Sequence, residues 1–181
     1  MHFSAYISVF AIQILILYSI NKYRNRLSSQ LTMAPSEFTL RLQVGITGGF
    51  APPSPSAIHT ITRDPSSPQL TINSLHRTPG SPDHQLTPQP TKNLPVKDYN
   101  TQIEQIYSIL KELPTEEPVG SEDIYGLDTG VSWSSGDGWK WSNGGPEGCG
   151  SEMSDVQVGK EEKVKFGEVV RLVIEIAEGS E

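Results

Sequence analysis

The stretch from Phe38 to Thr47, FTLRLQVGIT, alternates strictly between apolar residues and residues that are polar or glycine. Successive side chains of a β-strand point to opposite faces of a sheet, so a period of two gives the strand one apolar and one polar face. Such a strand is not stable alone, because its apolar face must be covered by other elements. We therefore expect a sheet with one buried face.

Further strands follow the same pattern. Two short strands are predicted at residues 57–62 and 70–75, separated by the turn-forming sequence RDPSSPQ, and with the first strand they form a meander. Residues 125–133 alternate again, with Leu127 and Val131 on the apolar side, and the sequence SSGDG then turns the chain.

All three tryptophans of the chain lie in this predicted hairpin. If Trp133 lies opposite Trp139, then Trp133, Trp139 and Trp141 share one face of the sheet. An exposed face of this kind would be an aromatic platform for sugars or bases. A covered face would be part of the core, and this is the arrangement that we expect.

Two amphipathic helices are predicted to cover the sheet. Their apolar positions are Ile103, Ile106, Tyr107 and Leu110 in the first helix, and Phe166, Val169, Val170, Val173, Ile174 and Ala177 in the second. Thr101 and Glu104 have the spacing of a capping box at the start of the first helix, and Pro114 ends it. The second helix, residues 165–178, is rich in β-branched residues, so a strand is its alternative interpretation.

These elements predict a single α+β domain over residues 38–178. Its antiparallel sheet has four to five strands, and two helices lie on one face. Within it, residues 76–97 are rich in proline and are predicted to form an exposed loop. Thr78, Ser81 and Thr87 each precede a proline, as proline-directed kinases require, so a membrane-tethered adaptor acting through this loop is one functional hypothesis.

The N-terminal residues 3–20 are apolar and uncharged, and Lys22, Arg24 and Arg26 follow them. Eighteen apolar residues are just long enough to cross a bilayer, and the basic flank predicts that the main domain faces the cytosol. Residues 1–32 are then a single transmembrane anchor, unless translation begins at Met33 and the segment is an extension of the gene model. A lone cysteine, Cys149, also favours a reducing compartment.

The distribution of charge and the absence of known motifs exclude several classes of function. From Glu112 onward the chain has sixteen acidic and five basic residues, which would repel nucleic acid and complement a basic protein surface. The histidines, which are His2, His59, His76 and His84, show no metal-ligand spacing, and neither a nucleophile elbow nor a phosphate-binding loop is present. We therefore predict a non-catalytic protein-binding domain without a metal or cofactor.

The candidate binding residues follow the first strand, and they are Gly48, Gly49, Phe50, Ala51 and Pro52. The glycines allow backbone conformations that other residues avoid, and the prolines stiffen the segment. Phe50 is then either presented to a partner at low entropic cost or folded back onto the core.

The order of these features resembles that of emfourin-type domains, which are protein inhibitors of thermolysin-like metallopeptidases. The resemblance covers residues 38–177: a strand ending in GGFAP, a proline-rich connection, a helix, a hairpin containing aspartate, and a closing amphipathic helix. Its local motif is Gly48, Gly49, Phe50 and Ala51. The resemblance implies that the partner is a peptidase.

Overall fold

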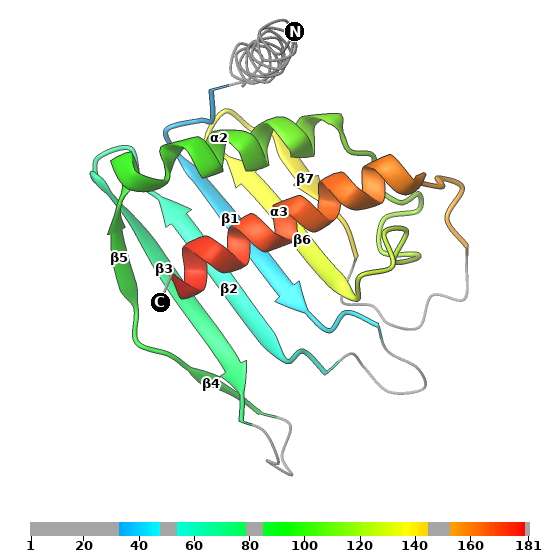
Figure 1. Cartoon of the computed structure of the whole chain (residues 1–181), viewed down its shortest axis with the longest axis horizontal. Helices are drawn as coiled ribbons and strands as arrows, with labels where there is room; N and C mark the ends of the chain where they lie inside the picture. The colour runs from blue at the N-terminus through cyan, green and yellow to red at the C-terminus, as the bar shows by residue number, and fades with distance from the viewer. Residues whose placement is uncertain (1–32, 48–53, 79–84, 145–152, 180–181) are drawn as a thin grey trace, which may run out of the picture. The chain divides into compact units, whose positions relative to one another are not determined.

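The computed structural model describes residues 33–47, 54–78, 85–144 and 153–179. They form one antiparallel sheet with two helices on the same face (Figure 1), so the predicted α+β class is confirmed. The strands are β1 (Phe38–Val44), β2 (Ala57–Arg63), β3 (Gln69–Arg77), β4 (Leu86–Pro88), β5 (Lys92–Pro95), β6 (Thr129–Ser135) and β7 (Lys140–Ser142). The helices are α2 (Val96–Glu112) and α3 (Lys160–Glu178), which run in opposite directions across the sheet.

Strand β1 lies inside the sheet, whose strand order is β4-β3-β2-β1-β6-β7, with β5 also pairing with β3. The predicted alternation holds, because Phe38, Leu40 and Leu42 are at most 2% exposed and belong to the core. Strands β2 and β3 complete the expected meander, with Leu40 opposite Ile61 and Ile61 opposite Ile72. The chain then passes through α2 and returns as β6 on the other side of β1.

The tryptophan hairpin forms, but its predicted register is wrong. Trp133 lies opposite Trp141 instead of Trp139, because the backbone N–H of Ser135 donates to the carbonyl of Trp139 at 3.1 Å, which makes the connecting loop two residues shorter than predicted. A shift of two residues keeps every side chain on its face. Trp133 and Trp141 are accordingly buried, and Trp139 is half-buried against Tyr107. The tryptophan face is core.

Both helices bury one side. The buried residues are Ile103, Ile106, Tyr107 and Leu110 in α2, and Phe166, Val169, Leu172, Val173, Ile176 and Ala177 in α3. Segment 165–178 is therefore a helix, as predicted, because its apolar residues recur every three or four positions and this spacing outweighs the strand preference of β-branched residues. It begins earlier than expected, at Lys160.

The predicted start of α2 is wrong. Thr101 and Glu104 do not form a capping box, because the helix begins five residues earlier, at Val96. Strand β5 pairs with β3 up to Pro95, and the chain enters the helix directly from this strand. Proline suits that position, because its fixed φ is compatible with the first turn and its missing N–H would lack a helical partner in any case.

The described part of residues 76–97 is not simply an exposed loop, and it brings the strands of the sheet to seven among the residues that the structure describes. Strands β4 and β5 lie within this stretch and pair with opposite ends of β3. They form an interrupted edge of the sheet, where prolines are tolerated because the missing N–H can face solvent. The sequence did not predict these strands, because frequent prolines interrupt the alternating pattern by which strands are identified.

The predicted anchor, residues 1–32, lies outside the described residues. Among the residues that are described, no helix is long and apolar enough to cross a bilayer.

Because Trp133 is 1% exposed and stacks on Phe38 with ring centroids 4.4 Å apart, Trp133→Ala should lower the free energy of unfolding by about 3–5 kcal/mol. Trp139→Ala is the matched control: its ring is half-buried, and it should cost clearly less. Urea denaturation followed by circular dichroism measures both. Equal losses for the two variants would contradict the assigned packing.

Candidate functional site

The candidate binding residues Gly48, Gly49, Phe50, Ala51 and Pro52 lie outside the described residues. Their two flanks are described, and they belong to the connection between β1 and β2, two paired strands of the sheet. Val44 lies opposite Ala57 at the end of this pairing. The residues where the chain enters and leaves the segment therefore define its position on the sheet.

Asp128 fixes the entering flank. Its Oδ1 atom accepts hydrogen bonds from the backbone N–H of Ile46 at 2.9 Å, from that of Thr47 at 2.7 Å, and from the Thr47 hydroxyl at 2.6 Å. The backbone N–H of Gly45 donates to the carbonyl of Asp128 at 2.8 Å. Asp128, the residue immediately before β6, thus fixes the backbone of Gly45, Ile46 and Thr47.

A tight turn places Asp128 there. The carboxylate of Asp123 accepts hydrogen bonds from the backbone N–H of Gly126 at 3.0 Å and from that of Asp128 at 2.7 Å. Asp128 has a positive φ of 51°, a conformation that aspartate tolerates better than most residues. The prediction that alternation extends back to residue 125 is therefore wrong, and Leu127 is 43% exposed instead of sharing the tryptophan face.

The environment of Asp128 favours its ionised form. Partial burial works against ionisation, but the hydrogen bonds from Thr47 and Ile46 together outweigh it and hold the pKa of the carboxyl below its usual value. Charge-assisted hydrogen bonds of this kind are stronger than neutral ones. The entering flank is thus held by a carboxylate that stays charged at neutral pH.

Close packing of the Ile46 side chain also fixes the entering flank. The side chain is 5% exposed and lies against Gly130 and Gly144. A Cβ at Gly144 would come within 2.3 Å of Ile46 Cδ1, and Gly144 also has a positive φ of 62°. The positive φ favours glycine at this position, and any other residue would also have to displace the end of the Ile46 side chain. Ile46 therefore seats the flank in the sheet.

Arg77 fixes the leaving flank. Its guanidinium donates hydrogen bonds to the carbonyls of Ser54 and Pro55, and its backbone N–H donates to the carbonyl of Ser56 at 2.9 Å. The backbone N–H of Ser56 in turn donates to the carbonyl of Val44 at 2.8 Å. Both flanks are therefore held by side chains from other parts of the sheet, and we call Asp128 and Arg77 with these contacts the double clamp.

A hollow beside β1 and β6 is also lined by polar side chains, but three of them, Arg41, Gln43 and Asn143, form hydrogen bonds within the sheet. Arg41 donates to Gln43 at 2.8 Å, and Gln43 donates to the carbonyl of Gly45 at 3.2 Å. Asn143 bridges the strands by accepting from the N–H of Val131 at 2.8 Å and donating to the carbonyl of Thr129 at 3.1 Å. This arrangement serves the fold.

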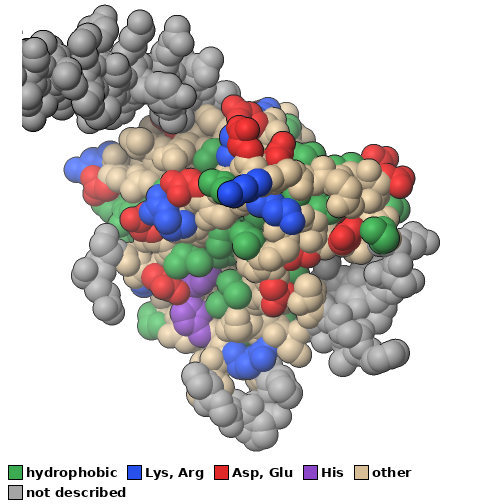
Figure 2. All heavy atoms as spheres, turned by 45° about the vertical axis from the view of Figure 1, so that its right-hand side comes forward, with side chains coloured by type: hydrophobic (Ala, Val, Ile, Leu, Met, Phe, Trp, Pro, Cys, Tyr) green, Lys and Arg blue, Asp and Glu red, His purple; other side chains and the backbone are tan. Residues whose placement is uncertain are grey.

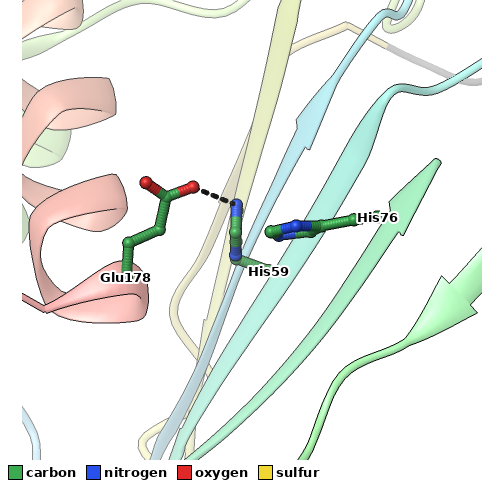
Figure 3. A group of neighbouring side chains, drawn as sticks. All are labelled: His59, His76 and Glu178. Atoms are coloured by element: carbon green, nitrogen blue, oxygen red, sulfur yellow. Dashed lines mark ion pairs between the residues drawn. The ribbon is translucent and has the colours of Figure 1, made fainter. Parts of the chain in front are cut away.

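A second group of titratable side chains comes together under the end of α3, where His59, His76 and Glu178 approach one another (Figure 3). His59 Nε2 lies 3.9 Å from Glu178 Oε1, and the two imidazole rings meet edge to face with centroids 5.3 Å apart. Sequence motifs missed this cluster, because the histidines are far apart along the chain. His59 lies in the predicted strand 57–62, but His76 was assigned to the predicted loop 76–97, and only the extension of β3 to Arg77 places it beside His59.

Burial, and then the neighbouring His76, lower the pKa of His59, while Glu178 opposes them in part. His59 is 1% exposed, so its neutral form is favoured at physiological pH. Of the other residues considered from the sequence, Cys149, His2 and His84 lie outside the described residues.

The chain has no significant match among protein-family models, curated proteins or solved structures.

Removing the Asp128 carboxylate should loosen the entering flank. Asp128→Ala eliminates the acceptor of three hydrogen bonds and puts alanine at a positive φ, so we expect a loss of about 1–3 kcal/mol in the free energy of unfolding. Asp128→Asn is the matched control, since it keeps an acceptor and tolerates the backbone conformation. In urea denaturation near pH 7, the free energy of unfolding should be highest for wild type, lower for Asp128→Asn and lowest for Asp128→Ala.

Wild type and Asp128→Asn also test whether the Asp128 side chain is charged in the folded protein. The folded-state pKa of Asp128 is below the unfolded value of about 3.9, so ionisation stabilises the fold above that pH, and this contribution is lost as the pH falls through the folded pKa. The stability difference between wild type and Asp128→Asn should be constant above about pH 5 and shrink in more acidic solution. A difference independent of pH would argue against a charged clamp.

Proposed function

We propose that this chain is a non-catalytic protein-binding domain that contacts its partner through residues 48–52. The observation that carries the proposal is the double clamp. Asp128 and Arg77 hold the residues on either side of this short segment, and neither belongs to the connection that it holds.

Binding through such a segment is favourable because part of the ordering cost is met in the free protein. A segment that becomes ordered only on binding loses conformational entropy at that moment, and the lost entropy weakens the complex. Here Ile46, Thr47, Ser54 and Pro55 are fixed by the fold before any partner arrives. An aromatic side chain between fixed ends, Phe50, is a good anchor for an interface.

The class of partner is proposed from two sources. The resemblance of the GGFA motif to emfourin-type domains implies a thermolysin-like metallopeptidase. The excess of acidic residues from Glu112 onward favours a partner with a basic surface and disfavours nucleic acid. Both sources are compatible with one role, a peptidase-inhibitor-like module.

The alternative, an adaptor acting through residues 76–97, has less support. Strands β4 and β5 occupy seven of those residues and pair with β3. Thr87, one of the threonines that precede a proline, lies within β4. A kinase needs an extended and accessible substrate segment, and this part of the stretch is committed to the sheet.

Phe50→Ala tests the proposal directly. The purified chain is titrated into an assay of a thermolysin-like peptidase, and we expect wild type to inhibit and Phe50→Ala to inhibit at least about 30-fold more weakly, as for an interface anchor worth about 2 kcal/mol. The thermal midpoint should stay unchanged. Val164→Ala, which removes an apolar side chain that is 65% exposed on α3, is the control and should inhibit like wild type.

Two results would count against the proposal. A lower thermal midpoint for Phe50→Ala with unchanged inhibition would mean that Phe50 belongs to the core. Absence of inhibition by folded wild type at micromolar concentration would remove this enzyme class, and affinity capture with wild type beside Phe50→Ala would then test for another protein partner.

A further inference from the structure

Three potential metal ligands from three different elements lie together at one end of the sheet. His59 comes from β2, His76 from β3 and Glu178 from the last turn of α3. One ligand atom from each residue can be chosen so that all three atoms lie within 4.8 Å of one another. Histidine side chains are visible at the surface beside acidic and apolar ones (Figure 2), and the Glu178 side chain is 54% exposed, so the cluster lies close to solvent.

His59 is oriented as metal-binding histidines are. Its Nδ1 atom is 2.9 Å from Ser74 Oγ, and its Nε2 atom faces Glu178 (Figure 3). A hydrogen bond at one ring nitrogen fixes the imidazole and leaves the other nitrogen for an ion. The 3.9 Å between His59 Nε2 and Glu178 Oε1 is too long for a hydrogen bond.

His76 supplies an independent observation. Its Nε2 atom is buried and has no hydrogen-bond partner. Buried polar atoms are almost always paired, so an unpaired one needs an explanation. His76 approaches His59 edge to face, and a bound ion would satisfy this ring as well as the Nε2 atom of His59.

Glu178 completes the set from the opposite side. Its side chain is 54% exposed and can adjust, and its Oε1 atom needs to move only from 3.9 Å to about 3.3 Å from His59 Nε2 to match the ligand spacing of a tetrahedral ion with bonds of about 2.0 Å. The ammonium of Lys92 donates to the carbonyls of Ala177 and Glu178 at 3.1 and 2.9 Å. Lys92 therefore holds the end of α3 over the strands.

We propose that His59, His76 and Glu178 bind one divalent transition-metal ion of the Zn²⁺ class. Two imidazoles and one carboxylate suit zinc and its neighbours and suit Ca²⁺ or Mg²⁺ poorly, since those ions prefer oxygen ligands. Three protein ligands leave a coordination position for water or for a side chain of a partner. The ion joins α3 to β2 and β3, so its binding stabilises the fold.

Calorimetric titration of the full-length chain, purified without a histidine tag and stripped with a chelator, tests the site with ZnCl₂. We expect one ion per chain with a dissociation constant in the micromolar range or tighter, and a thermal midpoint raised by zinc. MgCl₂ should give no such binding. Cobalt(II) absorption provides a second readout, because its visible spectrum reports the coordination geometry.

Variants locate the ion. His76→Gln and Glu178→Gln should each weaken zinc binding at least tenfold, while their circular dichroism without metal should match that of wild type. Glu175→Gln is the matched control, since Glu175 lies one turn earlier on α3, pairs with Arg171, and should bind zinc like wild type. No zinc binding by folded wild type would overturn the proposal. Binding that survives in His76→Gln and Glu178→Gln would also overturn it, because the ion would then lie elsewhere.

Discussion

The pairing of β1 with β6 is the contact on which the rest of this structure depends. It joins segments that are far apart in the sequence, with Leu40 opposite Trp133 and Leu42 opposite Val131. Without it, the meander of β1 to β3 would end at β1, and the apolar sides of the two helices would extend beyond the sheet. With it, Trp133 reaches both Phe38 and Tyr107, which links the sheet to α2.

The same pairing builds the proposed binding site. Strand β6 begins directly after Asp128, so fixing β6 beside β1 brings the Asp128 carboxylate to Ile46 and Thr47. It also brings Gly130 against the side chain of Ile46. The flank of residues 48–52 is therefore held by the tertiary fold and not by its own sequence. Stability and the proposed binding function thus share one structural cause.

Much of the fold was predictable because its signals are local. A period of two identified β1, and a spacing of three and four residues identified α3 even though its many valines and isoleucines favour strands. The edge strands β4 and β5 escaped because they are short and contain prolines, and such strands have no periodicity to detect. The tryptophan register depended on how the turn closes, and this is decided by hydrogen bonds within residues 135–139, among them the one from Ser135 N–H to the Trp139 carbonyl.

The sites were less predictable because they depend on contacts between distant residues. Nothing near Gly48 in the sequence indicates that Asp128 would hold its flank, since the aspartate is recognised only once β1 and β6 are paired. His59 and His76 become neighbours only when the register of β2 and β3 is known and α3 ends above them. In both cases the residues belong to no sequence motif, and only the folded chain brings them together.

Amide hydrogen exchange at Ile46 and Thr47 tests most directly the claim that the fold holds this flank. Both N–H groups lie beyond the end of β1, and in this structure both donate to Asp128 Oδ1. Slow exchange at Ile46 and Thr47, approaching that of the paired amides in β1, is the expected result. Exchange at the rate of an unprotected amide would contradict the account, because residues 48–52 would then extend from a flank that the fold does not hold.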